Sequence, residues 1–269
     1  MTAAPADRLV ARLRAAGCVF AEDEAALLRD HAADQGLDDA ALDRLVERRA
    51  AGEPLEQVVG WAEVAGIRVR LRPGVFVPRR RTALLVEAAE AAVLEAGVPR
   101  PVVVELCCGS GAVAAALGAR LDPREVHASD VDPVAVACAR DNLPPAPGRV
   151  VEVHVADLDA ALPARLESRV DVLAAHAPYV PSARLATLPP EARDHEPRHA
   201  LDGGGDGLEV VRRVLALAPR WLAPTGVLVL EAADDQLPAL TAAADRHGLR
   251  TEVVRDDDRG ALVVLARPA

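Results

Sequence analysis

Acidic side chains and a glycine-rich run stand at the ends of successive apolar segments of this chain. Glu105 lies inside one apolar segment, and the residues CCGSG follow it almost directly. Asp130 and Asp157 end the next two apolar segments. Glycines let a ligand approach the backbone closely, and carboxylates accept hydrogen bonds from hydroxyl and amino groups. The pattern therefore predicts a ligand that contains a ribose and an adenine. We expect Asp130 to accept hydrogen bonds from the ribose hydroxyls and Asp157 to accept one from the adenine amino group.

Two classes of ligand fit this pattern. Gly109, Gly111 and Ala114 satisfy G-x-G-x-x-A, and Asp130 follows at about the distance of the dinucleotide fingerprint. A dinucleotide-dependent oxidoreductase is therefore one hypothesis. Glu105 favours the other, because a buried acid has no role beside a pyrophosphate but offsets the charge of a cationic ligand. Turn and cap chemistry is a structural alternative for Asp130 and Asp157.

An α/β domain must position these residues. From Thr82 onward apolar strands alternate with amphipathic helices, which predicts a parallel sheet covered on both faces. The last two predicted strands are separated by only four residues, which are too few for a helical crossover, so we expect a terminal hairpin. The predicted strands are VVVEL (102–106), EVHASD (125–130), VVEVHVAD (150–157), VDVLAA (170–175), GVLVLE (226–231), TEVVRD (251–256) and ALVVLA (261–266).

The N-terminal part has a different pattern. Residues 6–50 carry helical periodicity, with breaks at Gly17 and Gly36 and an N-cap at Asp38, and predict a small helical bundle. Residues 64–71 alternate apolar residues with arginines, which predicts one strand. We expect a helical domain at 1–62, a connecting strand or hairpin at 63–80 and a ligand-binding catalytic domain at 81–269.

Composition excludes several classes of protein. The net charge of -10 argues against a nonspecific nucleic-acid binder. No segment is long and apolar enough for a membrane span, and no secretory signal is recognisable, so we expect a cytoplasmic protein without a membrane partner. The four cysteines form no C-x-x-C pair and indicate neither a disulfide framework nor a zinc site.

The segment after the fourth predicted strand reads His176-Ala177-Pro178-Tyr179. With it, the chain resembles the HemK-like (PrmC-type) bacterial protein glutamine N5-methyltransferases, which modify the glutamine of the Gly-Gly-Gln loop in peptide-chain release factors. The resemblance covers almost the whole chain. It rests on GEPL (52–55) with Gly60, RPGVFVPR (72–79), ELCCGSGAVA (105–114), SDVDPVAVACARDN (129–142), Glu196-Pro197 and the run from Asp206 to Glu231.

The resemblance implies a class I methyltransferase fold, with a doubly wound, mostly parallel seven-stranded sheet behind the helical bundle. It also implies S-adenosylmethionine as cofactor and a helical domain that contacts a protein substrate. The implied cofactor-binding residues are Glu105, Cys107, Gly109, Gly111, Asp130, Val131, Asp157, Leu158, Arg79 and Thr82. The implied substrate-binding residues are Phe76, Pro78, Glu196 and Pro197, and the implied catalytic residues are His176, Ala177, Pro178 and Tyr179.

Two departures from the family pattern concern the acceptor. The family loop is Asn-Pro-Pro-Tyr, whose Asn side-chain oxygen and first proline carbonyl hold the two amide hydrogens of the substrate; here His176 and Ala177 replace them. The family also continues with two acids where this chain has Arg79-Arg80-Arg81-Thr82-Ala83, which predicts a positive field that attracts an acidic or phosphate-bearing substrate. A solvated arginine surface is the simpler alternative.

His176 leaves three hypotheses open. It accepts a hydrogen bond from an amide, it acts as a general base for an amine or hydroxyl, or it marks a site that binds cofactor without catalysis. The corresponding functions are protein glutamine methylation on a release-factor-like partner, methylation of a small molecule in secondary metabolism, and a non-catalytic regulator.

Other motifs do not support an alternative chemistry. His195-Glu196-Pro197-Arg198-His199 spells H-E-x-x-H, but Pro197 prevents the single helix that a zinc site of this type needs. The run from Asp202 to Gly207 resembles a phosphate loop without its lysine, and we expect a hinge that starts a helix. No serine stands in a G-x-S-x-G elbow. We expect no metal.

Overall fold

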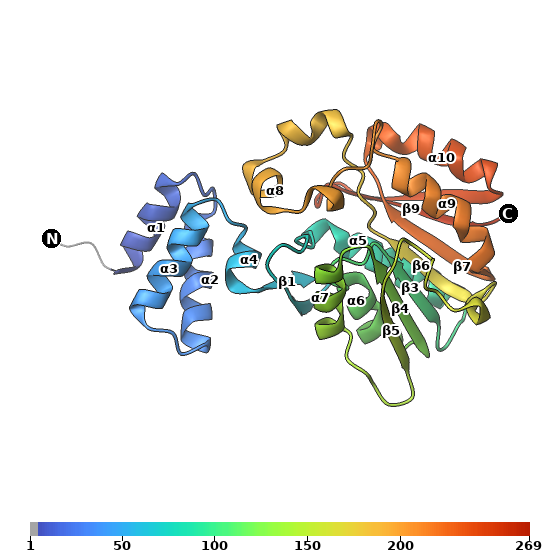
Figure 1. Cartoon of the computed structure of the whole chain (residues 1–269), viewed down its shortest axis with the longest axis horizontal. Helices are drawn as coiled ribbons and strands as arrows, with labels where there is room; N and C mark the ends of the chain where they lie inside the picture. Colours follow the sequence, from blue (N-terminus) through green and yellow to red (C-terminus); the bar gives the residue numbers. More distant parts are fainter. Residues whose placement is uncertain (1–4) are drawn as a thin grey trace.

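The structure is a computed structural model that describes residues 5–269. A helical bundle lies at one end of the molecule and a larger α/β part at the other (Figure 1). No helix among the described residues is long and apolar enough to cross a membrane.

Four helices form the N-terminal bundle: α1 (Pro5–Ala15), α2 (Ala21–Asp34), α3 (Asp39–Ala50) and α4 (Leu55–Val59). Asp38 caps α3 as expected, because its carboxylate accepts a 2.8 Å hydrogen bond from the amide of Ala41. Leu13, Leu28 and Val46 are fully buried and join the first three helices in one apolar core. The division of the chain at residue 62 stays a proposal, and a strand spans that position.

A hairpin connects the bundle to the α/β part. Its strands are β1 (Trp61–Val64) and β2 (Ile67–Arg70), which are antiparallel. The expectation of one strand over 64–71 was therefore wrong. Ala65 and Gly66 both have positive φ, at 50° and 81°, and this is the backbone of a two-residue hairpin turn. An alanine in the first turn position gave little sign of it.

Seven strands form the sheet, in the order β5-β4-β3-β6-β7-β9-β8. Only β9 runs antiparallel to its neighbours, because the terminal hairpin returns into the sheet between β7 and β8. The strands are β3 (Val102–Leu106), β4 (Glu125–Asp130), β5 (Val150–Val155), β6 (Val170–Ala175), β7 (Leu222–Glu231), β8 (Leu249–Asp256) and β9 (Ala261–Pro268). The predicted fold class is confirmed.

Helices cover both faces of this sheet. On one face lie α5 (Ala83–Glu95), α6 (Ala112–Leu121) and α7 (Pro133–Asn142), and on the other α9 (Glu209–Trp221) and α10 (Leu237–Arg246). Because both faces are covered, every residue of β3 and β6 is buried, as is usual for parallel strands. Short segments complete the chain: η1 (Arg80–Thr82), η2 (Ala164–Leu166), η3 (Ser182–Thr187), α8 (Pro190–His195), η4 (Arg198–Ala200) and η5 (Asp234–Gln236).

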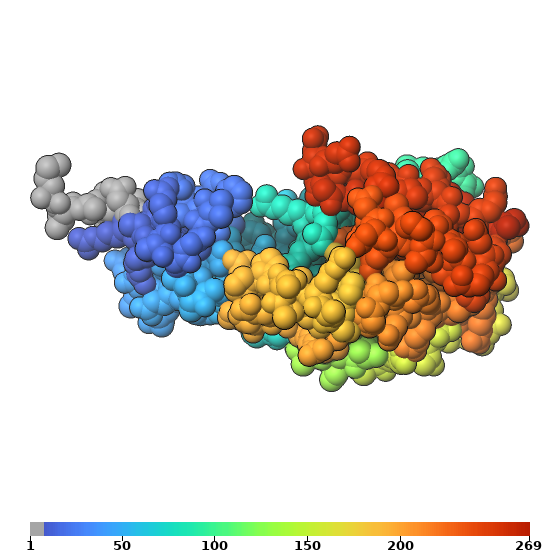
Figure 2. Space-filling view, turned by 90° about the horizontal axis from the view of Figure 1, so that it is seen from above, coloured from blue at the N-terminus to red at the C-terminus, as the bar shows by residue number. Residues whose placement is uncertain are grey.

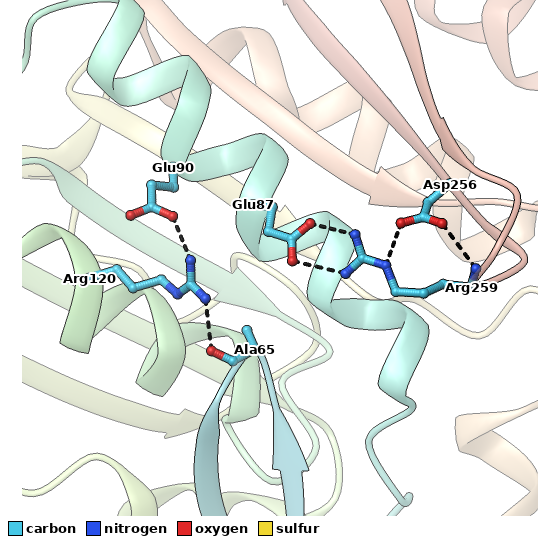
Figure 3. A network of polar contacts seen from close by, with 6 residues as sticks. All are labelled: Ala65, Glu87, Glu90, Arg120, Asp256 and Arg259. Carbon is cyan, nitrogen blue, oxygen red and sulfur yellow. Dashed lines mark hydrogen bonds and ion pairs between the residues drawn. The ribbon is translucent and has the colours of Figure 1, made fainter.

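Helix α5 ties two hairpins to the body of the molecule (Figure 3). Arg259, in the β8–β9 turn, donates to both carboxylate oxygens of Glu87 at 2.9 and 2.6 Å. Arg120 of α6 donates to Glu90 at 2.7 Å and to the carbonyl of Ala65 in the β1–β2 turn at 2.8 Å. The connecting hairpin is therefore held against the catalytic part.

Candidate functional site

A cavity of about 330 Å³ opens where β3, β4 and β6 end. Such crevices at the carboxyl ends of parallel strands are the usual ligand sites of doubly wound sheets. Twelve of the predicted site residues line it: Phe76, Pro78, Thr82, Glu105, Cys107, Gly109, Asp130, Val131, Asp157, Leu158, His176 and Pro178.

Glu105 forms a hydrogen bond with the first turn of α6. Its side chain is 2% exposed, and its Oε2 accepts a 2.8 Å hydrogen bond from the amide of Ala114. Burial raises the pKa of this carboxyl to about 8, although the amides of Ala114 and Val113 lower it in part. The amide of Ala114, in the first helical turn where a pyrophosphate would bind in a dinucleotide enzyme, is thus already paired with a side chain.

Asp130 holds the glycine turn in place. Its Oδ2 accepts a hydrogen bond from the amide of Gly109 at 2.9 Å, and its Oδ1 accepts one from the amide of Asp132 at 3.0 Å. Gly109 has a φ of +52°, in the left-handed region that favours glycine. Each carboxylate oxygen has a second lone pair, so the group can also accept from a ligand hydroxyl.

The charges around the cavity distinguish between a dinucleotide and a cationic ligand. Glu105, Asp130 and Asp157 all line it, whereas Arg213 is its one lining arginine. Arg213 already donates to Asp157 at 2.8 Å. Because Glu105 is largely protonated at neutral pH in the ligand-free protein, the repulsion of an anionic pyrophosphate comes from Asp130. A cationic ligand would be attracted there and would favour the ionised form of Glu105.

The donor set fits S-adenosylmethionine. Carboxylates face the cavity for a cationic centre and for ribose hydroxyls, and apolar side chains such as Val131 and Leu158 complete its wall. The hydroxyl of Ser110 also lines the cavity, is buried and has no hydrogen-bond partner among the described residues. A buried hydroxyl without a partner is costly, so it is available to a ligand.

A second, larger cavity of about 680 Å³ meets the first at the loop after β6. Phe76 and His176 line both cavities, while Ala177 and Tyr179 line the second. The Phe76 and His176 rings are nearly perpendicular, at 80°, and make an edge-to-face contact with centroids 5.2 Å apart. The loop that we predicted to be catalytic therefore forms part of the partition between the two spaces.

Glu231, at the end of β7, stands behind this loop. Its Oε2 lies 3.6 Å from Nε2 of His176 and accepts from the hydroxyl of Thr82 at 3.0 Å. Arg81 donates to Oε1 of Glu231 at 2.6 Å and also contacts the Tyr179 hydroxyl. Burial raises the pKa of Glu231, but the charge and hydrogen bond of Arg81 and the hydrogen bond from Thr82 help to hold it below the usual value, so the carboxylate is ionised.

His176 is neutral in this setting. Burial lowers its pKa below the ordinary value, and Arg81 and Arg79 lower it further, against the opposing effect of Glu231. The negative charge of Glu231 beside Nε2 favours the tautomer with its proton on that atom. Nδ1 then carries a lone pair and can accept one hydrogen bond.

The three consecutive arginines do not create the strong positive field that we expected. Arg79 forms a 2.5 Å ion pair with Glu196, and Arg81 pairs with Glu231. Glu196 and Glu231, which are distant in the sequence, thus supply negative charge beside these arginines. In the family pattern, two acids directly after the segment that ends at Arg79 supply it. Of these three arginines, Arg80 alone has no ion pair among the described residues.

Besides Ala177 and Tyr179, which line the second cavity, four predicted residues lie outside the first cavity. Arg79 lines the second cavity instead, with its guanidinium over the ring of Phe76. Glu196 is buried and accepts from the amide of Val77 at 3.2 Å; it and Pro197 line neither cavity. Gly111 begins α6, and a Cβ there would lie 3.0 Å from Ala139, so its glycine serves packing.

The sequence analysis missed other lining residues, which are Cys108, Ser110, Ala112, Val113, Ala156, His199, Ala200, Val210 and Arg213. Most are small or apolar and carry no signal of their own. Glu231 was also missed, although it ends an apolar strand just as Asp130 does. The H-E-x-x-H string was rightly set aside, because α8 ends at His195.

Comparisons with known proteins agree with this geometry. Residues 103–195 match the model of the family described as methyltransferase domain. The release factor glutamine methyltransferase of Mycolicibacterium smegmatis is 40% identical over 263 residues, which cover 92% of this chain and 90% of that protein. The 4-amino-L-phenylalanine/4-methylamino-L-phenylalanine methyltransferase of Streptomyces pristinaespiralis is 37% identical over 207 residues, or 75% and 69% of the two chains.

A solved structure shows the same fold. The ribosomal protein L11 methylase of Lactobacillus delbrueckii subsp. bulgaricus superimposes with a TM-score of 0.52 at 17% identity, over 75% of this chain and 86% of that one. This chain is an S-adenosylmethionine-dependent methyltransferase and belongs to the release factor glutamine methyltransferase family.

Proposed function

We propose that the protein methylates the side-chain amide nitrogen of a glutamine in a release-factor-like protein. The observation that carries this proposal is the partition formed by Phe76 and His176 between two cavities. A donor in the acidic cavity and an acceptor side chain in the second would meet there. S-adenosylmethionine supplies, when bound, a methyl group on a positively charged sulfur.

The loop after β6 offers two acceptors for the two amide hydrogens. Ala177 lines the second cavity, and its carbonyl receives no hydrogen bond from the described residues. The neutral ring of His176 offers the lone pair of Nδ1. Together they would hold the amide with its nitrogen turned toward the first cavity, so that the protein contributes mainly by orientation.

The helical bundle supports a protein substrate. It is included in the match to the Mycolicibacterium release factor methyltransferase, which covers nearly all of both chains. The segment with α8 lies between this bundle and the α/β part (Figure 2), and its Glu191 lines the second cavity. A substrate loop in that cavity would therefore have the bundle beside it.

A second candidate is methylation of an aromatic amine. Two observations favour it: His176 is a buried neutral imidazole next to a carboxylate, which suits a general base, and one relative is named as an aminophenylalanine methyltransferase. An amide nitrogen needs positioning, whereas an aromatic amine is uncharged and already nucleophilic at neutral pH and loses a proton to a base as its nitrogen is methylated. His176 would therefore orient an amide as a hydrogen-bond acceptor, and it would act as a general base for an aromatic amine.

One labelling experiment separates these functions. The protein is incubated with S-adenosylmethionine carrying a labelled methyl group and with either a release factor or 4-amino-L-phenylalanine. A release factor whose Gly-Gly-Gln glutamine is replaced by alanine is the control. Label on the intact release factor alone supports the proposal, label on the amine supports the second candidate, and label on neither contradicts both.

A further inference from the structure

A cluster of histidine and carboxylate side chains lies on the outer strands of the sheet, away from the methyl-transfer site. His127 is on β4, and Glu152 and His154 are on the edge strand β5. Val126, Ala128 and their neighbours face α7, so by strand alternation the cluster lies on the opposite face. The register pairs His127 directly with Glu152.

Three donor atoms of the cluster converge. Nδ1 of His127 lies 3.5 Å from Oε2 of Glu152, and Nε2 of His154 lies 3.4 Å from the same oxygen. All three atoms are within 4.8 Å of one another. The two imidazole rings are stacked, with centroids 6.5 Å apart and an interplanar angle of 7°, so the partly exposed His154 ring must turn to bring both lone pairs to one ion.

Two of these atoms are buried without a hydrogen bond. Nδ1 of His127 and Nε2 of His154 have no hydrogen-bond partner among the described residues. The His127 side chain is completely buried. Buried polar atoms without a partner are rare and costly in folded proteins, and two of them here lie within 3.5 Å of one carboxylate oxygen.

The surroundings set the tautomer of His127. Its Nε2 lies 3.2 Å from Oε2 of Glu125, and Arg165 holds that carboxylate from the other side. An N–H on Nε2 therefore donates to Glu125, and Nδ1 keeps its lone pair. A carboxylate that orients the far nitrogen of a metal-bound histidine is the common outer-shell arrangement.

We propose that His127, Glu152 and His154 form a binding site for a zinc ion. A tetrahedral ion with ligands at about 2.0–2.1 Å has ligand-to-ligand distances of about 3.3–3.4 Å, close to the two distances found here. Two imidazoles and a carboxylate are ligands that zinc accepts. The side chain of Glu152 is 41% exposed, so water can reach the ion and occupy its fourth coordination position.

This proposal departs from the sequence-based expectation of no metal, which considered cysteine pairs and H-E-x-x-H strings. Two adjacent parallel strands supply these ligands, so their spacing of some 25 residues follows no motif. The ion would link edge strand β5 to β4. Because it binds the folded chain, zinc should raise the unfolding temperature.

The test uses the untagged full chain after removal of metal by a chelator. Titration with zinc chloride in a calorimeter should show one ion per chain, and the unfolding temperature should rise. Glu152→Gln and His154→Gln should each weaken zinc binding at least about tenfold. His247→Gln, at an exposed histidine after α10, is the matched control and should bind like the unmodified protein.

Cobalt distinguishes this site from the cysteines. Co²⁺ in the proposed site should give the intense visible bands of tetrahedral coordination without the near-ultraviolet charge-transfer band of a thiolate ligand. Absence of stoichiometric zinc binding, a thiolate band, or affinity that survives both Glu152→Gln and His154→Gln would each overturn the proposal. Glu125→Gln should weaken binding about 10–100-fold by loosening His127.

Discussion

Two buried glutamates shape the methyl-transfer site at the level of single residues. Glu105 and Glu231 lie at the ends of β3 and β7, with exposures of 2% and 4%. They differ in their partners. Glu105 receives only backbone amides, and its pKa rises to about 8. Glu231 receives Arg81 and Thr82 and stays ionised, so the two carboxyls have different charge states at neutral pH.

The pH dependence of methyl transfer should report on His176. Its neutral form is the acceptor or base, and its pKa lies below the ordinary value of about 6.5. We expect kcat/KM to stay level as the pH falls to about 6.5 and to decrease only below that. His176→Asn, whose side chain does not titrate, should lack this decrease. The same decrease in the variant would assign it to another group.

The stability of the ligand-free protein should depend on pH through Glu105. Its pKa is about 8 when folded and about 4.3 when unfolded, so the folded state binds the extra proton between these values. Stability relative to Glu105→Gln should therefore fall as the pH rises from about 5 to about 8, by at most about 1.4 kcal/mol per unit.

Urea unfolding of both proteins at several pH values measures this difference. The glutamine oxygen can still accept from the amide of Ala114, which keeps the helix start similar in the two proteins. A difference that does not change with pH would show that Glu105 ionises as readily in the folded chain as in the unfolded one.

At the level of elements, a glycine loop supports the loop after β6. Val180 accepts from the amide of Gly203 at 2.9 Å and donates to the carbonyl of Leu201 at 3.0 Å. A Cβ at Gly207 would lie 2.2 Å from the carbonyl oxygen of Tyr179. The segment 202–207, which we expected to be a hinge, is instead packed against the backbone of the predicted catalytic loop.

Gly207→Ala should therefore impair methyl transfer, although it adds only one methyl group. Gly207 has a φ of +80° as well as the close carbonyl, so alanine would be strained and would displace Tyr179. We expect at least about a tenfold loss of kcat/KM, equivalent to about 1.4 kcal/mol. Gly205→Ala is the matched control, because a Cβ there would meet only the carboxylate of Glu209, at 4.0 Å. Equal losses in both variants would contradict this account.

The elements themselves were largely predictable. Strands β3, β4 and β6 begin and end where the apolar runs do, because each is enclosed by neighbours and its sequence reports that burial. The β1–β2 turn was missed because Ala65 carries no turn signal. The pairing of Arg81 with Glu231 joins residues 150 positions apart, and the His127 cluster depends on strand register. Neither can be deduced from local spacing.

At the level of the whole molecule, one arginine links the helical bundle to the segment over the second cavity. Arg49 of α3 is 7% exposed and donates to Glu24 of α2 at 2.7 Å. It also forms a 2.7 Å ion pair with Glu191 of α8. Burial opposes its charge, but both glutamates hold the pKa of Arg49 above the usual value. The bundle and α8 are therefore joined by charge at this point.

This link predicts how the bundle contributes to acceptor binding. Glu191→Gln removes the charge on α8 but leaves Arg49 paired with Glu24. Because Glu191 is about half exposed, its loss should change stability by no more than about 1 kcal/mol. S-adenosylmethionine should bind unchanged, since Glu191 does not line the first cavity. The KM for a release factor should rise several-fold if the bundle and α8 present one surface to the protein.

Asp194→Asn is the matched control for this prediction, because Asp194 lies on the same helix but pairs only with neighbouring Arg193. Steady-state kinetics with varied release factor, together with calorimetric binding of S-adenosylmethionine, give the two constants needed. A rise in KM for Glu191→Gln alone would mean that Glu191 contributes to acceptor binding, through its ion pair with Arg49 or as part of the wall of the second cavity. Unchanged KM in both variants would mean that the bundle binds its substrate independently of α8.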